Sequence, residues 1–142
     1  MLSAFAPGKT VGSEALLNWI VQQSAAQTLF VPSIAVAEIE KGICKLRRAG
    51  GAARATRLSQ WLDGLIANFG DQILGVDALV AREAGAIEDA AIAKGRSPGL
   101  ADVLIAATAK AHGLTVLTAN EKHFKRLNIT CLNPFANLPG EQ

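Results

Sequence analysis

Two carboxylates that stand alone within apolar segments are the residues of this chain best suited to chemistry. Glu38 ends an apolar run that begins at Leu29, and no other acid lies between Glu14 and Glu38. Asp102 lies within an equally apolar segment, residues 99–107. A carboxylate rarely occupies such a position unless a partner compensates its charge. If the fold brings them together, these carboxylates would form a site for a hard cation such as Mg²⁺. Enzymes that cleave phosphodiester bonds commonly use such a cation.

Each of these residues also has a structural interpretation. Asp102 could be an acid in the first turn of a helix, where the helix dipole favours negative charge. Glu38 could be a surface residue that pairs with Lys41 on the same helical face. Glu40 is expected to be solvated, and Asn120 suits a turn as well as a site. These alternatives stay open at the level of single residues.

Several cations accompany the acids. One predicted helix ends in a basic cluster formed by Lys41, Lys45, Arg47 and Arg48. This cluster would either complement the helix dipole or hold an RNA backbone. Arg96, in a predicted loop, suits phosphate contact or simple exposure to solvent. The cations therefore permit a nucleic-acid substrate without requiring one.

The composition is that of a globular protein with a substantial core. The chain has 142 residues, of which 50% are hydrophobic and 18% are charged. The length suits one domain over residues 1–142, and the hydrophobic fraction excludes a disordered or fibrous protein. The net charge of +2 allows nucleic-acid binding without arguing for it.

Cysteine and histidine are sparse. Cys44 and Cys131 lie far apart and show neither a disulfide framework nor metal-ligand spacing, and His112 and His123 are too scattered for a zinc site. We therefore expect a reducing, cytoplasmic location. No uncharged run reaches the ~18 apolar residues of a membrane span. The N-terminus also lacks the charge order of a signal peptide, so no membrane association is expected.

Short apolar runs alternate with longer helical patterns along the chain. The pattern predicts strands at residues 28–31, 73–76, 114–117 and 129–132. It predicts helices at residues 13–26, 33–48, around 58–69, 77–94, 100–111 and 121–127. Asp77 is expected to be an N-cap and Gly113 a C-terminal glycine, and the helix at residues 100–111 is apolar enough to be buried on most sides. The helix around residues 58–69 has an apolar face formed by Leu58, Trp61, Leu62, Leu65, Ile66 and Phe69. Such alternation is typical of an α/β protein whose parallel sheet is covered on both faces. Sites in these sheets lie beyond the carboxyl ends of the strands, and Glu38, Asp102 and Asn120 are all placed where they can converge there.

Three segments resemble, in their order and spacing, the motifs of PIN-domain ribonucleases. They are residues 32–43 with Glu38, residues 100–109 with Asp102, and residues 116–124 with Asn120. The closing residues 132–135 also fit, so that the resemblance covers about residues 2–136. The chain is most similar to the VapC/FitB-like toxins of bacterial toxin–antitoxin pairs.

The resemblance implies a fold and a function. The implied fold is a three-layer α/β/α sandwich with a central parallel sheet. The implied function is a metal-dependent endoribonuclease toxin of a type II toxin–antitoxin pair, in which Glu38 and Asp102 bind Mg²⁺ or Mn²⁺ and Asn120 joins them in the catalytic site. The implied partners are an RNA substrate, a cognate antitoxin and a second copy of the chain in a homodimer.

The sequence departs from the family pattern at two places. The pattern begins with a strand ending in Asp-Thr-Asn-Val-Leu-Ser, whose Asp is a metal ligand, whereas here Met1 takes the Val position before Leu2 and Ser3. We therefore expect a domain that is truncated relative to the family, through a late start codon or a true truncation. Asn120 occupies a position that is often Asp in the family. Two alternatives stay open: a catalytically silent PIN-like module that binds an antitoxin, and an unrelated α/β scaffold whose acids are structural.

Overall fold

A computed structural model describes residues 28–133 of the chain. Contacts divide the chain into two compact units that meet in sequence after Leu74, and each is described by itself. The predicted helix at residues 13–26, the departure from the family pattern at the N-terminus and the end of the closing motif lie outside the described residues. The single domain over residues 1–142 stays a prediction.

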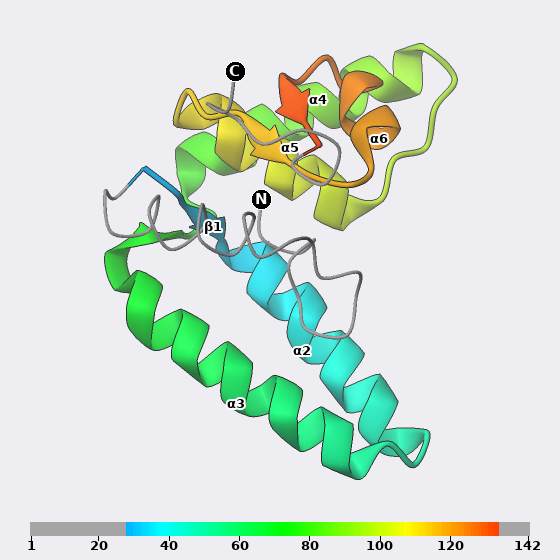
Figure 1. The fold of residues 1–142 in the computed structure, drawn as a ribbon. Helices are drawn as coiled ribbons and strands as arrows, with labels where there is room; N and C mark the ends of the chain where they lie inside the picture. The colour runs from blue at the N-terminus through cyan, green and yellow to red at the C-terminus, as the bar shows by residue number, and fades with distance from the viewer. Residues whose placement is uncertain (1–27, 134–142) are drawn as a thin grey trace. The chain divides into compact units, whose positions relative to one another are not determined.

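The first unit contains a helical hairpin (Figure 1). Helix α2 (Ser33–Arg48) and helix α3 (Ala52–Phe69) lie side by side and run in opposite directions. Gly50, in the turn between them, has a φ of +94°, which glycine adopts without strain. The N–H groups of Gly50 and Gly51 donate to carbonyls in the last turn of α2. This Schellman arrangement ends the helix where the sequence predicts its end.

Two short strands flank the hairpin. Strand β1 (Val31–Pro32) precedes α2, and strand β2 (Ile73–Leu74) follows α3 after one 3-10 turn (Gly70–Gln72). The strands pair in parallel, as predicted. They are shorter than the predicted strands at residues 28–31 and 73–76. Proline has no N–H to donate, and α2 begins at the next residue, so the ladder cannot continue beyond β1.

The faces that α2 and α3 turn toward the core are apolar at helical spacing. The buried residues are Ala35, Ile39 and Ile43 of α2, and Ala55, Leu62, Leu65 and Phe69 of α3. Trp61 is half-buried. The prediction that Ile66 lies on the apolar face of α3 is wrong, because 42% of this residue is exposed. It follows the buried Leu65, and consecutive residues of a helix point about 100° apart.

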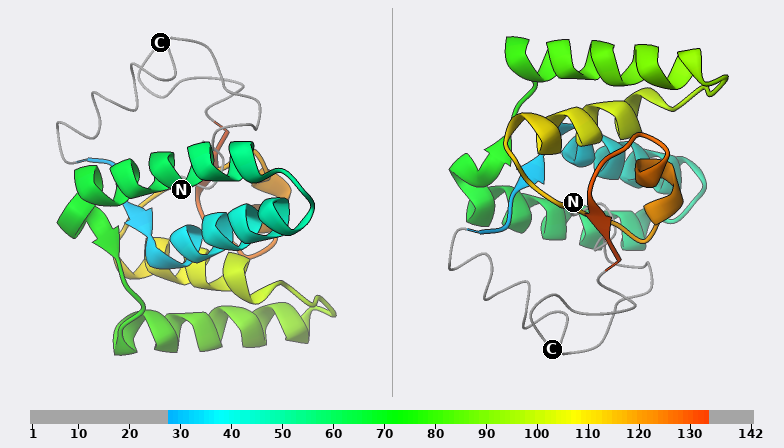
Figure 2. Two further views of the ribbon diagram at one scale, coloured as in Figure 1. Left: turned by 90° about the horizontal axis from the view of Figure 1, so that it is seen from below. Right: turned by 90° about the horizontal axis from the view of Figure 1, so that it is seen from above.

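The second unit also combines helices with a parallel strand pair. Its elements are α4 (Ala78–Ala93), α5 (Leu100–Ala111), β3 (Val116–Leu117), α6 (Glu121–Lys125) and β4 (Cys131–Leu132). Helices α4 and α5 lie side by side (Figure 2). Strands β3 and β4 pair in parallel. The elements agree with the prediction in kind and order, but each strand begins two residues later than the predicted strand.

Local signals set the ends of α4 and α5. Asp77 is the N-cap of α4, and its Oδ1 accepts a hydrogen bond from the Val80 N–H at 2.9 Å. Gly95 and Gly113 follow the two helices with φ values of +75° and +64°. The residue after each glycine donates its N–H to a carbonyl in the last helical turn. These features confirm the predicted cap and the predicted C-terminal glycine at residue 113.

Helix α5 is the core element of the second unit. Val103 and residues 105–109 are buried, which confirms the prediction of a helix buried on most sides. The buried Thr108 hydroxyl donates to the Leu104 carbonyl at 2.7 Å, so this polar group is satisfied within the helix. Leu100, at the start of α5, is 65% exposed. Among the helices of residues 28–133, none has the length and apolar character needed to cross a bilayer.

Candidate functional site

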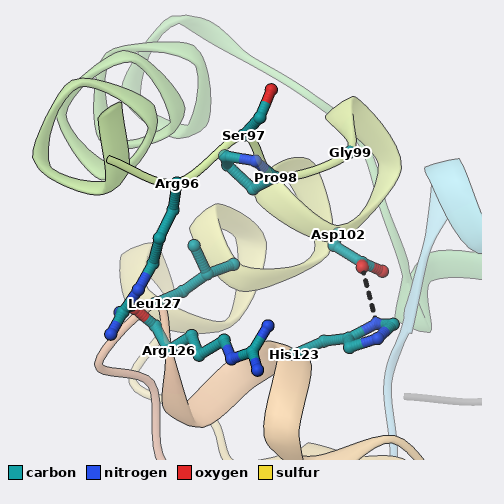
Figure 3. A pocket seen from close by; sticks show the side chains of 8 residues that line it. All are labelled: Arg96, Ser97, Pro98, Gly99, Asp102, His123, Arg126 and Leu127. Atoms are coloured by element: carbon teal, nitrogen blue, oxygen red, sulfur yellow. Dashed lines mark hydrogen bonds and ion pairs between the residues drawn. The ribbon is translucent and has the colours of Figure 1, made fainter. Parts of the chain in front are cut away.

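Asp102 lies in the first turn of α5, at the edge of a hollow (Figure 3). Gly99 is the N-cap of this helix and Asp102 is the third helical residue. The Asp102 side chain is 35% exposed, whereas the adjacent Val103 is fully buried. The helix dipole favours a carboxylate here, and the exposure leaves that carboxylate open to a ligand. The position therefore suits both the structural and the metal-binding interpretation.

His123 of α6 is the direct partner of Asp102. Its Nδ1 lies 3.1 Å from Oδ2 of Asp102, which makes a hydrogen bond, and an ion pair when the imidazole is protonated. Only one carboxylate oxygen takes part, and within residues 28–133 the other oxygen, Oδ1, accepts no hydrogen bond. Asp102 therefore keeps an oxygen with free lone pairs beside the hollow.

The hollow beside Asp102 has a volume of about 190 Å³. Its walls come from the loop before α5 (residues 96–99), from Asp102, and from His123, Arg126 and Leu127. Nη1 of Arg96 donates to the backbone carbonyl of Arg126 at 2.7 Å. The Arg126 side chain extends toward His123 (Figure 3). One acid, one histidine and two arginines thus share a small open hollow.

Glu38 lies in the second turn of α2 and is exposed. Its apolar sequence context suggests burial, but the neighbour Ile39 is the residue that points into the core. Within residues 28–133, Glu38 forms no ion pair with Lys41. Glu40 is exposed, as predicted. Glu38 belongs to the first unit and Asp102 to the second, so a cation shared by the two carboxylates stays a prediction.

Asn120 immediately precedes α6 and is exposed. Its N–H donates to Oγ1 of Thr118 at 3.0 Å, and its carbonyl accepts from the His123 N–H at 3.1 Å. These bonds form the turn that leads into α6. The side chain of Asn120 makes no capping hydrogen bond and is not part of the described wall of the hollow. A catalytic role for Asn120 stays a prediction.

His123 and Arg126 are the site residues that the sequence analysis missed. His123 was considered there only as a zinc ligand. A signal was nevertheless present, because His123 lies in the motif-like segment 116–124 and is three residues from Arg126. Side chains three residues apart share a helical face. Among residues 28–133 no group of three His, Cys, Asp or Glu side chains is arranged to hold a metal.

Cys131, at the start of β4, has a perturbed thiol. Burial raises the pKa of Cys131, the charge of Glu121 raises this pKa further, and Lys125 opposes both effects. The thiol also donates to the backbone carbonyl of Glu121, with Sγ 3.6 Å from the oxygen. Cys131 therefore stays protonated near neutral pH.

Comparison with known sequences places the chain in a family. The family model of the PIN domain matches residues 1–129. The chain is 30% identical over 128 residues to VapC ribonuclease Y4jK of Sinorhizobium fredii, and the match covers 89% of each chain. It is 33% identical over 125 residues to plasmid stability protein StbB of Pseudomonas syringae pv. tomato, and this match covers 84% of each chain.

Comparison with solved structures agrees. The crystal structure of FitAcB from Neisseria gonorrhoeae is similar to this chain with a TM-score of 0.76 and 27% sequence identity, over 93% of each chain. This likeness confirms the predicted fold class, a PIN-like α/β sandwich with parallel strands. The ordered motifs, the parallel strand pairs and both comparisons lead to one conclusion: the chain belongs to the PIN domain family.

Proposed function

We propose that this chain is a metal-dependent endoribonuclease, the toxin of a type II toxin–antitoxin pair, and that it cleaves phosphodiester bonds of RNA. The observation that carries the proposal is the carboxylate of Asp102, which has one free oxygen beside a hollow lined by two arginines. A cation bound to the carboxylate and a phosphate bound to the arginines would then be neighbours. The similarity to a VapC ribonuclease supports the same reaction.

The available donors fit a hard cation. Glu38 is exposed and Asp102 is half-exposed, and carboxylate oxygens are the ligands that Mg²⁺ and Mn²⁺ prefer. In the proposed site these two residues hold the cation, and Asn120 adds an amide oxygen. When bound, the cation lowers the pKa of a water molecule and neutralises charge on the scissile phosphate.

The remaining side chains orient the site and its substrate. The bond from His123 to Oδ2 of Asp102 restrains the carboxylate, and within residues 28–133 Oδ1 is left without a hydrogen bond. Residues that orient a metal ligand in this way tune its affinity for the metal. Arg126 makes no ion pair within residues 28–133, so its charge is available for a phosphate. His123 is thus a positioning residue, and Arg126 is a substrate-binding one.

Three partners belong to the proposal: RNA, a cognate antitoxin and a second copy of the chain. Exposed apolar side chains support a protein partner, because contact with a partner would remove their apolar surface from water. In the second unit, Leu79, Ile92 and Leu100 are 57%, 58% and 65% exposed. Light scattering at micromolar concentration should show a dimer, and a clean monomer would contradict this part. Co-expression with the adjacent small open reading frame should yield a complex.

The decisive experiment is cleavage of a pool of structured RNAs with Mn²⁺. Asp102→Asn and Glu38→Gln are each expected to lower the rate by at least roughly 100-fold. Asp89→Asn is the matched control for Asp102→Asn, and Glu40→Gln is the matched control for Glu38→Gln. Each control acid is exposed and lies in the same unit as the residue to which it is matched. A form extended by the strand and Asp with which the family pattern begins is assayed in parallel. Equal cleavage by all variants would indicate a contaminating nuclease and defeat the proposal.

One observation favours a second function, a catalytically silent PIN-like module that binds an antitoxin. Residues 28–133 contain no group of three metal-ligating side chains, and two carboxylates bind Mg²⁺ weakly. Under this alternative no form cleaves RNA with Mn²⁺. The antitoxin still co-purifies, and Asp102→Asn leaves the complex intact.

A further inference from the structure

The hollow beside Asp102 adjoins a second hollow in the same unit. The second hollow has a volume of about 160 Å³ and lies against α4, Lys110 of α5 and residues 126–128. Arg126 and Leu127 form part of the wall of both hollows. Residues 126 and 127, at the C-terminal end of α6, therefore form a wall that is common to the two hollows.

Positive charge follows both hollows. Arg96 and Arg126 line the first, and Arg126, Lys94 and Lys110 line the second. Asp102 is the one acid in the described wall of the first hollow, and the described wall of the second contains none. Lys110 is partly neutralised, because its Nζ lies 3.5 Å from a carboxylate oxygen of Glu83. Within residues 28–133, Lys94 and Arg126 have no ion-pair partner.

The backbone fixes where these cations lie. Gly95 ends α4 with a φ of +75°, and this turn places Lys94 and Arg96 on either side of it. The N–H of Arg96 donates to the Ala91 carbonyl at 3.0 Å. Its guanidinium bonds the Arg126 carbonyl at 2.7 Å. This hydrogen bond holds the loop after α4 against the end of α6. The segment that carries Lys94 and Arg96 and the segment that carries Arg126 are therefore held together.

We propose that the two hollows form a continuous track for the phosphate backbone of single-stranded RNA, which runs from Asp102 past Arg126 to Lys94. This inference rests on the proposed function and adds the path of the substrate on one side of the cleavage site. Arg126 binds the phosphate next to the Asp102 end, and Lys94 binds a phosphate farther along. Ile87 and Leu127 also line the second hollow, and because they are only 6% and 8% exposed they close its floor.

Binding without cleavage tests the track. A fluorescein-labelled single-stranded RNA of mixed sequence is titrated in EDTA with the Asp102→Asn protein, and anisotropy is measured at several salt concentrations. Arg126→Gln and Lys94→Gln in this background are each expected to weaken binding about tenfold and to reduce the salt slope by about 0.7. Arg126→Lys, which keeps the charge, should retain most of the affinity. The bond from Arg96 survives these changes because it uses the backbone carbonyl of residue 126.

Arg82→Gln and Lys122→Gln are the matched controls. Both cations are exposed, lie in the same unit and are absent from the walls of the two hollows. The controls should bind within about twofold of the background protein, since they remove only general attraction. RNA binding that falls equally in track and control variants would overturn the track. RNA binding that none of the variants changes would also overturn the track, and it would indicate that these cations bind an acidic protein partner instead.

Cleavage separates this inference from the proposed function. In the protein that keeps Asp102, Arg126→Gln should raise KM more than it lowers kcat. Track-dependent binding without any cleavage by the unsubstituted protein would defeat the proposed function and leave the track standing. Normal cleavage together with equal RNA affinity of Arg126→Gln and Arg82→Gln would defeat the track and leave the function standing.

Discussion

Nδ1 of His123 and Oδ2 of Asp102 lie 3.1 Å apart, which joins α6 to the first turn of α5. Both side chains are partly exposed, at 57% and 35%. An exposed pair of this kind contributes at most about 1 kcal/mol to stability. In the proposed site this pair orients a carboxylate that would hold a cation. Loss of the pair should therefore lower the affinity for the metal more than it lowers the free energy of unfolding.

His123→Ala is therefore expected to weaken Mn²⁺ binding by about tenfold while the urea midpoint of unfolding stays nearly unchanged. Isothermal titration calorimetry measures the first quantity, and urea unfolding measures the second. His112→Ala is the control, because His112 is exposed and follows the other end of α5. The same Mn²⁺ affinity in both variants would show that His123 does not position Asp102.

A pair of glycines in and after α4 should respond in opposite ways to alanine. Gly95 has a φ of +75°, so Gly95→Ala should lower the free energy of unfolding by about 1 kcal/mol. Gly85 lies inside α4, and a Cβ there would meet nothing within 4 Å, so Gly85→Ala should raise it by about 0.5–1 kcal/mol. Urea unfolding of both variants measures the two changes. The reverse order would contradict the left-handed turn that positions Lys94 and Arg96.

The cap of α4 gives a third prediction. Asp77→Ala removes the acceptor for the Val80 N–H and should destabilise the protein by about 1 kcal/mol. Asp77→Ser keeps an acceptor and should retain most of that stability. Asp71→Ala serves as control, because Asp71 is an exposed acid outside any cap. Thermal unfolding compares the three proteins, and equal losses for Ala and Ser would rule out the capping bond as the cause.

The sequence predicts helices better than strands because helix signals are local. The cap at Asp77 and the glycine at residue 113 act within one turn of the helices that they bound, and both predictions hold. Strand pairing joins distant segments, such as Val31 with Ile73. An apolar run such as residues 28–31 shows that burial is favoured, but not how many of its residues find a partner on the neighbouring strand.

The site residues likewise differ in how well the sequence predicts them. Asp102 was predicted because an acid in an apolar segment is conspicuous, and the structure places it beside a hollow. The same argument suggested burial for Glu38, which is exposed because the helical period turns it away from the buried Ile39. His123 was missed because its contact with Asp102 spans 21 residues of sequence. Its place in segment 116–124 and its spacing from Arg126 point to His123 as a site residue, but neither signal identifies Asp102 as its partner.

The two cysteines should differ in their reactivity toward iodoacetamide. Cys44 is exposed, whereas burial and then the charge of Glu121 raise the pKa of Cys131, with Lys125 opposing them. The thiolate is the reactive form, so Cys131 should be alkylated more slowly at pH 8. The folded state favours the protonated Cys131 thiol. The resulting stabilisation is complete below the pKa of the unfolded thiol, about 8.5, and is lost as the pH rises through the raised pKa of the folded state.

Two substitutions near Cys131 test the cause of its raised pKa. Glu121→Gln removes the negative charge that raises the pKa of Cys131, so it should speed alkylation at a fixed pH. Lys125→Gln removes the charge that lowers this pKa, so it should slow alkylation. The backbone carbonyl that accepts the Cys131 hydrogen bond is present in both variants, which isolates the charge effect. Mass spectrometry of the two cysteine-bearing peptides measures the rates, with Cys44 as the internal reference. Because burial is the larger cause, both variants should still label Cys131 more slowly than Cys44, and a Cys131 that reacts first would refute that assignment.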